Sequence, residues 1–154
     1  MLRYNVFSAL LLGGVVLSGE LVRKLKYRAR LFLKEAESVG DPDIAIFFAE
    51  QAIQLYTKAV YYELFGDLIR GHRLRELLSL LIRELRKYGF NNLADKVMEF
   101  IDSFRRVLIL VENAYTMSRY SELSYSADEA ELAVDTAQKL INLLEEVVRN
   151  VKLG

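Results

Sequence analysis

The stretch of sequence that decides the fold is Phe47-Phe48-Ala49-Glu50-Gln51-Ala52-Ile53-Gln54-Leu55-Tyr56-Thr57-Lys58-Ala59. Small side chains recur at helical spacing through this stretch and just before it. They are Ala45, Ala49, Ala52 and Ala59. A seam of small side chains along one side of a helix lets a second helix approach closely. The stretch therefore predicts a long helix that packs tightly against a neighbour.

A second seam on the same helix is large and apolar, but an amide and an ammonium interrupt it. Its members are Ile44, Phe48, Gln51, Leu55, Lys58 and Tyr62. Lys58 has two interpretations. Its ammonium can bind a phosphate, or its aliphatic stem can cover apolar surface while the charge reaches water. We keep Lys58 as a candidate phosphate-binding residue with both interpretations open.

Signals for helix starts and helix ends on both sides of this helix indicate that it is one of a series of helices. Asp41-Pro42-Asp43 supplies a cap and a proline in the first turn, and Ser126-Ala127-Asp128-Glu129 is typical of a capping box. Gly66 and Gly89 mark helix ends. The periodicity of apolar residues then predicts six helices, at roughly 3–18, 20–38, 43–65, 72–88, 91–118 and 126–152.

Length and composition agree with this series. The chain has 154 residues, one proline and no cysteine. Short connections between long helices predict an all-α, antiparallel up-and-down bundle of five to six helices. We expect a single domain over 1–154, with 1–18 as an apolar N-terminal helical extension and 20–152 as the bundle. The absence of cysteine excludes disulfides and thiolate metal sites, and it fits a cytoplasmic protein.

Apolar content suggests a partner subunit. Hydrophobic residues make up 53% of the chain, and Ile46, Ile53 and Val60 form a further apolar seam on the helix that contains the central stretch. We therefore predict a homodimer. The run Val6–Leu17 is too short to span a membrane, which takes about 20 residues. We expect it to pack on the bundle or a second subunit, with a signal peptide or a membrane-surface anchor as alternatives.

Charge is balanced overall but not along the chain. Residues 21–90 hold 13 basic and 9 acidic side chains, whereas residues 91–154 hold 7 basic and 11 acidic ones. The two halves can be differently charged solvated faces, help two copies to dock, or direct one face toward a polyanion. Arginines cluster at Arg70, Arg73 and Arg75 and again at Arg105-Arg106. Such clusters fit a solvated or interface face, or a nucleic-acid contact.

Sequence motifs for catalysis and cofactor binding are missing. The chain has no glycine-rich phosphate loop, no nucleophile elbow and no metal-ligand cluster, so we expect neither a cofactor nor a metal. His72 is the only histidine. It can act as a general acid or base, because its unperturbed pKa is about 6.5, or it can stabilise the turn before the fourth helix. We favour the structural role, since no second histidine supports catalysis.

The order "AEQA…L…KA…G…H…L…LL", which starts at Ala49 and includes Lys58, Gly66 and His72, resembles the HEPN family of small helical domains. The resemblance covers about residues 20–150. It implies a helical fold and a homodimer. It also implies partnership with a minimal nucleotidyltransferase, which HEPN proteins often accompany.

The resemblance also bears on ribonuclease activity. Many HEPN proteins cut RNA with an arginine and a histidine separated by four to six residues. Arg119 matches that arginine, but the positions open to the histidine are occupied by Ser124, Tyr125 and Ser126. Tyrosine, with an unperturbed pKa of about 10, is a poor proton shuttle near neutral pH. We therefore assign no catalytic residue, with Arg119 and His72 as the weak candidates.

Binding remains as the role for the segment around Arg119. Arg119 can contact phosphate, with Tyr120 and Tyr125 as stacking surfaces; alternatively, the segment is an ordinary polar loop anchored by buried tyrosines. The sequence predicts a non-catalytic, dimeric HEPN-type binding and assembly protein. By the resemblance, it partners a minimal nucleotidyltransferase and binds a nucleotide or RNA phosphate. The alternative is a toxin-like HEPN ribonuclease with a degenerate site.

Overall fold

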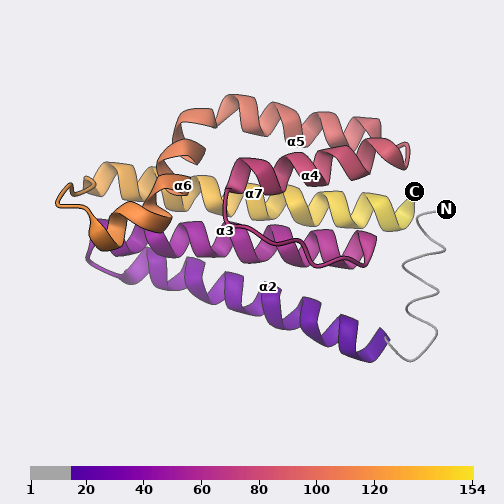
Figure 1. The fold of residues 1–154 in the computed structure, drawn as a ribbon, viewed down its shortest axis with the longest axis horizontal. Helices are drawn as coiled ribbons and strands as arrows, with labels where there is room; N and C mark the ends of the chain where they lie inside the picture. Colours follow the sequence, from indigo (N-terminus) through magenta and orange to yellow (C-terminus); the bar gives the residue numbers. More distant parts are fainter. Residues whose placement is uncertain (1–14) are drawn as a thin grey trace.

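The computed structural model describes the backbone of residues 15–154 and the side chains from Gly19 onward, except that of Arg119. Within 15–154 every regular element is a helix, so the predicted all-α bundle is confirmed (Figure 1). The helices are α2 (Val15–Ser38), α3 (Pro42–Phe65), α4 (Leu74–Lys87), α5 (Asn91–Ser103), α6 (Arg105–Tyr120) and α7 (Ala127–Leu153).

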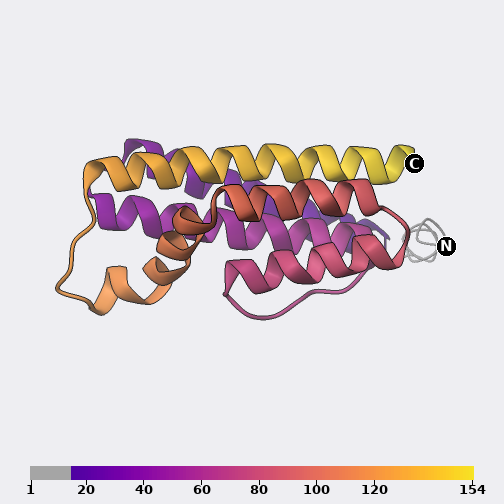
Figure 2. The ribbon, with the colours of Figure 1, turned by 90° about the horizontal axis from the view of Figure 1, so that it is seen from above.

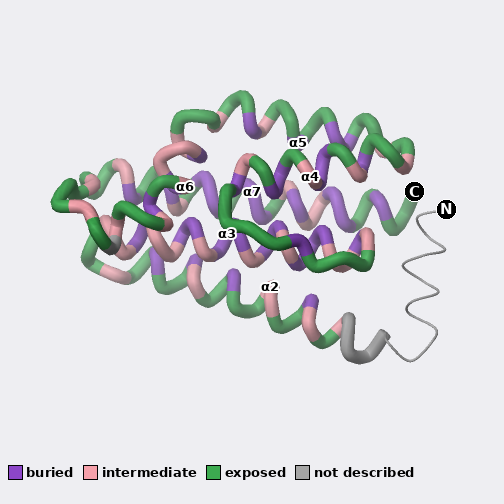
Figure 3. Tube along the Cα trace, viewed as in Figure 1, coloured by how far each residue is buried: buried purple, intermediate pink, exposed green. Residues whose placement is uncertain are grey.

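Helix α3 is the central element of the bundle. It packs against α2, α4, α6 and α7, and most of its residues are buried or half-buried (Figure 3). The seam of Ile46, Ile53 and Val60 is fully buried inside the single chain. This apolar seam, from which the homodimer was predicted, is therefore covered by neighbouring helices of the same chain. A dimer needs other support.

The predicted helix signals of α3 and α7 are confirmed atom by atom. Asp41 caps α3, because its side chain accepts hydrogen bonds from the backbone N–H groups of Asp43 and Ile44. Gly66 ends α3 with a positive φ of 73°, a conformation that glycine adopts without steric cost. Ser126 and Glu129 form the reciprocal capping box at the start of α7. These local contacts fix both ends of α3 and the start of α7.

The connection from α3 to α4 is not a tight hairpin. Residues 66–73 run back along α3, so that α4 starts beside the middle of α3 and runs in the same direction (Figures 1 and 2). Eight extended residues can span roughly 26 Å, which is enough for this return. Ile69 is buried and anchors the segment. The antiparallel arrangement holds for α2 with α3 and for α4 with α5, while α3 and α4 are parallel.

The single helix predicted over 91–118 is wrong, because it is interrupted at Phe104. There the backbone leaves the helical region, with φ −112° and ψ 20°, and α6 turns away from the line of α5 (Figure 2). The Phe104 ring stacks on Phe100 at 4.4 Å between centroids, and the Lys139 ammonium lies 5.6 Å from its centre. Packing of the aromatic ring, rather than a glycine or proline, accompanies the break, and α6 is thereby directed onto α3.

The break predicted between residues 18 and 20 is also absent. Helix α2 begins at Val15 and continues through Gly19. A glycine inside a helix costs only about 1 kcal/mol relative to alanine, which the rest of a 24-residue helix can offset. The first part of the helix predicted at 3–18 lies outside the described residues. Among the helices that the structure describes, none is long and apolar enough to cross a membrane.

Glu63 joins three helices through its carboxylate. One carboxylate oxygen of Glu63 lies 2.7 Å from the Lys26 ammonium of α2. The other oxygen pairs with the Lys152 ammonium near the end of α7. Burial alone would raise the pKa of Glu63, but hydrogen bonds from Lys152 and Lys26 outweigh burial and hold the pKa below its usual value. The ionised carboxylate is therefore the form that stabilises the fold.

We expect Glu63→Gln to lower the free energy of unfolding by about 1–2 kcal/mol at pH 7, because two charge-assisted hydrogen bonds are lost. A depressed pKa in the folded state means that this contribution is present above the unfolded pKa of about 4.3 and is lost as pH falls through the folded pKa. Urea denaturation at pH 7 and pH 3 measures the difference in the free energy of unfolding between the variant and the wild type. An equal difference between the two proteins at both pH values would contradict the assignment.

Candidate functional site

A ladder of polar side chains runs along α3 inside the bundle. Glu50 is fully buried, and its two carboxylate oxygens accept hydrogen bonds from the amides of Gln51 and Gln54, each at 2.7 Å. The amide oxygen of Gln54 in turn accepts a hydrogen bond from the Lys58 ammonium at 3.1 Å. The ladder therefore links a buried carboxylate to the half-buried Lys58.

Lys58 is held by this ladder in a partly dry environment. Burial lowers its pKa, and the opposing charge of Glu50 acts in the other direction. A half-buried ammonium with one protein hydrogen bond keeps further donors, since a lysine has three. The ladder can thus hold Lys58 ready for an anionic group. The same contacts also suit the other interpretation, in which the lysine stem covers apolar surface and its charge reaches water.

His72 lies where α6 meets the start of α4. Its ring stacks on Tyr115 of α6, with 4.2 Å between centroids and 8° between planes. The sequence predicts only that His72 stabilises the turn before the fourth helix, and the structure gives its partner on α6. His72 is nevertheless exposed, so the stack covers a face of the imidazole while the residue remains open to solvent. The stacking contact fits a structural role for His72, and the exposure of the residue also fits a role in catalysis.

Beside this stack, a second contact ties α4 to α6. The carboxylate of Glu112 accepts two bonds from the Arg75 guanidinium, at 2.9 and 3.3 Å, and a long one from the Arg75 backbone N–H. The backbone N–H groups at a helix start attract anions. Glu112 is therefore the anion at the start of α4. Any phosphate there would have to displace it.

An open pocket of about 920 Å³ lies between these two helices. It is lined by His72 and by the charged side chains of Arg73, Arg75, Glu76 and Glu112. The two arginines already form ion pairs, Arg73 with Glu76 and Arg75 with Glu112. The arginine cluster seen in the sequence is therefore largely neutralised by carboxylates of the same chain.

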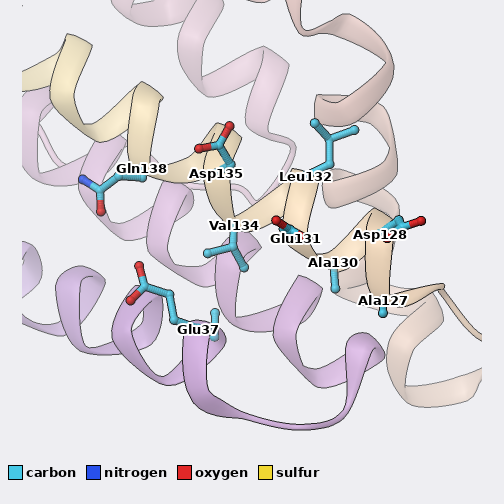
Figure 4. Close-up of a pocket in the computed structure, with 10 residues that line it drawn as sticks. Glu37, Ala127, Asp128, Ala130, Glu131, Leu132, Val134, Asp135 and Gln138 are labelled. Carbon is cyan, nitrogen blue, oxygen red and sulfur yellow. The ribbon is translucent and has the colours of Figure 1, made fainter.

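A second open pocket, of about 640 Å³, lies between α2 and the first half of α7. Figure 4 shows Glu37 projecting from α2 toward α7, which contributes Asp128, Glu131 and Asp135. These four carboxylates make the pocket unsuitable for phosphate. Among the described residues, no group of three or more histidine, cysteine or acidic side chains has a geometry that could hold a metal ion.

The segment that joins α6 to α7 is fastened to the start of α3. The backbone N–H of Tyr125 donates to the Asp43 carboxylate at 2.7 Å, and Ser126 is engaged in the cap of α7. Burial raises the pKa of the Tyr125 phenol, and the charges of Asp43 and Glu129 raise it further. Tyr125 thus lies among carboxylates, which is an unfavourable place for a phosphate.

A sequence model of the HEPN domain matches residues 22–147. The chain belongs to the HEPN family. The match covers most of the chain, and the helical fold described above agrees with it. No curated protein and no solved structure gave a match to set beside it.

Arg119, which matches the arginine of the HEPN ribonuclease pattern in the sequence, can be placed on the backbone. Arg119 lies in the last turn of α6, while its side chain is outside what the structure describes. Tyr115 precedes it by four residues, and residues so spaced on a helix share a face with about 6 Å between their Cβ atoms. Because His72 stacks on Tyr115, the fold brings His72 to the face of α6 that carries Arg119. Tyr120 ends the helix with 78% of its surface exposed.

Sequence reasoning missed three residues of this HEPN domain. Glu50 stands in the quoted stretch, and an acidic residue among alanines and isoleucine could have indicated a buried carboxylate. Glu112 is the one acidic residue between Asp102 and Glu122, but nothing in the sequence pairs it with Arg75. Tyr115 lies 43 residues after His72 in the sequence, and their contact depends on where the return segment 66–73 leads.

Proposed function

We propose that this chain is a HEPN-type binding and assembly protein that acts as a homodimer and does not cut RNA. The observation that carries the proposal is the environment of residues 124–126, where the family's histidine would stand. Tyr125 is bound to Asp43, and Ser126 caps α7 with Glu129. Tyr125 and Ser126 therefore stabilise the fold, and both lie beside the carboxylates of Asp43 and Glu129.

The chemistry of RNA cleavage supports the same conclusion. Cleavage of a phosphodiester through the 2′-hydroxyl needs a group that titrates near neutral pH, and such help is worth about 10²–10⁴-fold. The pKa of Tyr125 is raised by burial and then by Asp43 and Glu129, so its proton is even less available than in free tyrosine. Two nearby carboxylates also oppose the approach of a phosphate.

The ligand that we propose is the phosphate of a nucleotide or RNA, bound through Lys58. The polar ladder fixes the ammonium through Gln54, and partial burial strengthens its attraction for an anion. Arg119 and the exposed Tyr120 stand at the end of α6, beside the start of α3 and roughly 20 Å from Lys58 at 1.5 Å per helical residue. They would therefore contact a second phosphate and a base of an RNA strand long enough to span both places. Tyr125 is not included in this proposal, because its neighbours are acidic.

The dimer is supported by apolar surface at the end of α6 and in the segment that follows. Met117, Tyr120 and Leu123 are exposed there, with Leu123 at 70%. A specific interface usually buries at least about 1,000 Å² in total, and aromatic and methionine side chains are enriched in its core. The partnership with a minimal nucleotidyltransferase rests on membership of the family.

Binding of a labelled nucleotide and of a short single-stranded RNA, measured by fluorescence anisotropy on the full chain, tests the proposal. We expect Lys58→Gln to weaken binding by about tenfold or more, because a charge-assisted contact is lost. Lys139→Gln, at an exposed lysine of α7, is the matched control and should change little. Sedimentation velocity should show a dimer at micromolar concentration. A monomer that binds neither probe would overturn the proposal.

The alternative function is an RNA-cleaving HEPN protein, and the stack of His72 on Tyr115 favours it. That contact brings the only histidine of the chain to the helix face that carries Arg119. Incubation of the purified protein with single-stranded RNA distinguishes the two functions. Cleavage that disappears in both His72→Ala and Arg119→Ala, while the fold persists, would establish the alternative. Binding without cleavage supports the binding protein.

A further inference from the structure

Helix α2 divides its positive charges between two faces. Lys26 and Arg30 turn toward the bundle, where they pair with Glu63 and Glu145. Four other cations are exposed and have no ion-pair partner among the side chains that the structure describes. They are Arg23, Lys24, Arg28 and Lys34. The bundle therefore leaves half of the length of α2 strongly basic on its outer side.

Two apolar side chains lie among these cations. Tyr27 is 63% exposed and Leu31 is 41% exposed, and they are one turn apart. At 3.6 residues per turn, all six side chains fall within an arc of about 140°. We call this surface the α2 basic face; it consists of Arg23, Lys24, Tyr27, Arg28, Leu31 and Lys34. Residues 21–34 contain no acidic side chain, and Glu20 and Glu35 stand at the ends of the stretch.

The position of α2 leaves this face accessible. α2 lies at the edge of the bundle, packs on α3 and α7, and turns exposed residues outward (Figures 1 and 3). In the sequence, the apolar run Val6–Leu17 ends three residues before the basic stretch 21–34. A helix with cations around exposed aromatic and aliphatic side chains is suited to the boundary between lipid headgroups and acyl chains. A cluster of cations next to an apolar segment is attracted to anionic lipids.

We propose that the α2 basic face is a docking surface for a membrane of anionic phospholipids. The four cations lie against the headgroups, and Tyr27 and Leu31 enter the boundary with the acyl chains. The competing occupant is a single-stranded nucleic acid, which also attracts cations and stacks on tyrosine. The membrane accounts better for Leu31, which a phosphate backbone does not use, and for the apolar run Val6–Leu17, which comes before the basic stretch in the sequence. The bundle lies on the membrane and does not cross it.

Co-sedimentation of the full chain with vesicles tests the proposal. The probes are vesicles of phosphatidylcholine alone and of phosphatidylcholine with 30% phosphatidylglycerol. We expect binding to the anionic vesicles, weakened by added salt. The variant with Arg23, Lys24, Arg28 and Lys34 all changed to glutamine should bind roughly 10²–10³-fold more weakly, from the effect of each cation near an anionic surface. Tyr27→Ser with Leu31→Ser should also weaken binding while keeping its dependence on charge.

The control variant carries Arg106→Gln and Arg149→Gln, at exposed cations of α6 and α7, and should bind as the wild type does. Circular dichroism checks that each variant keeps its helices. Equal binding to neutral and anionic vesicles, or unchanged binding by the four-glutamine variant, would overturn the proposal. So would the absence of binding to anionic vesicles. If the wild type then binds RNA and the four-glutamine variant does not, the face belongs to nucleic acid.

Discussion

Tyr56→Ala is expected to lower the free energy of unfolding by about 4 kcal/mol, the largest effect that we foresee for a single substitution. The Tyr56 side chain is fully buried at the centre of α3. Its ring lies under two cations of α2, with Arg30 at 5.1 Å and Lys26 at 5.6 Å from the centroid. Removal of the ring leaves a cavity and takes away both cation–π contacts.

The matched control is Tyr56→Phe, which keeps the ring and removes the hydroxyl that accepts a hydrogen bond from Arg30 at 3.0 Å. We expect a loss of only about 1 kcal/mol, because the exposed guanidinium can bond to water instead. Urea denaturation followed by circular dichroism measures both changes. For a domain of this size the melting temperature should fall by about 8–16 °C for alanine and about 2–4 °C for phenylalanine. Equal losses would show that the hydroxyl, not the ring, is important.

Glu50→Ala is expected to cost about 3 kcal/mol, since one partner is removed from a buried hydrogen-bonded network. The amides of Gln51 and Gln54 each lose the carboxylate oxygen to which they donate. The free amide of Gln54 can then turn, so the position of Lys58 is no longer fixed. The same substitution should therefore weaken the proposed phosphate binding as well as the fold.

Glu50→Gln separates these two effects. It keeps the volume and one oxygen acceptor but removes the charge and the second acceptor. We expect about half of the loss in stability, measured by urea denaturation as before. Phosphate binding by this variant, measured under conditions where it is fully folded, shows whether the ladder positions Lys58. Unchanged stability in both Glu50 variants would mean that the network contributes nothing to the fold.

Local signals in the sequence predicted the helix ends well, because they depend on neighbouring residues. The Asp41 cap, the left-handed Gly66 and the capping box of Ser126 each act within four residues of the chain. The apolar residues of α4 recur at helical spacing, which is also a local signal, and the six that are buried are Leu74, Leu77, Leu78, Leu81, Ile82 and Leu85. Family membership was also recognisable, from the alanine-rich stretch and the order of residues after it.

Features that depend on distant residues were not predictable. The break at Phe104 has no glycine or proline to indicate it, and it is accompanied by an aromatic stack and Lys139 of α7. The contacts of His72 with Tyr115 and of Arg75 with Glu112 join residues about 40 positions apart. The candidate site is assembled by such long-range contacts, which explains why its residues are recognisable one by one in the sequence but their neighbours in space are not.

The central position of α3 has a consequence for how the chain is made. Its two largest contact surfaces are with α2, which precedes it, and α7, which is completed only at residue 153. At 5–20 residues per second, synthesis of the intervening chain takes roughly 4–18 s. During that time α2 and α3 can pair, but one apolar side of α3 has no cover. A nascent chain that stalls before Ala127 would present this side to the cell, and we expect it to be a substrate for chaperones.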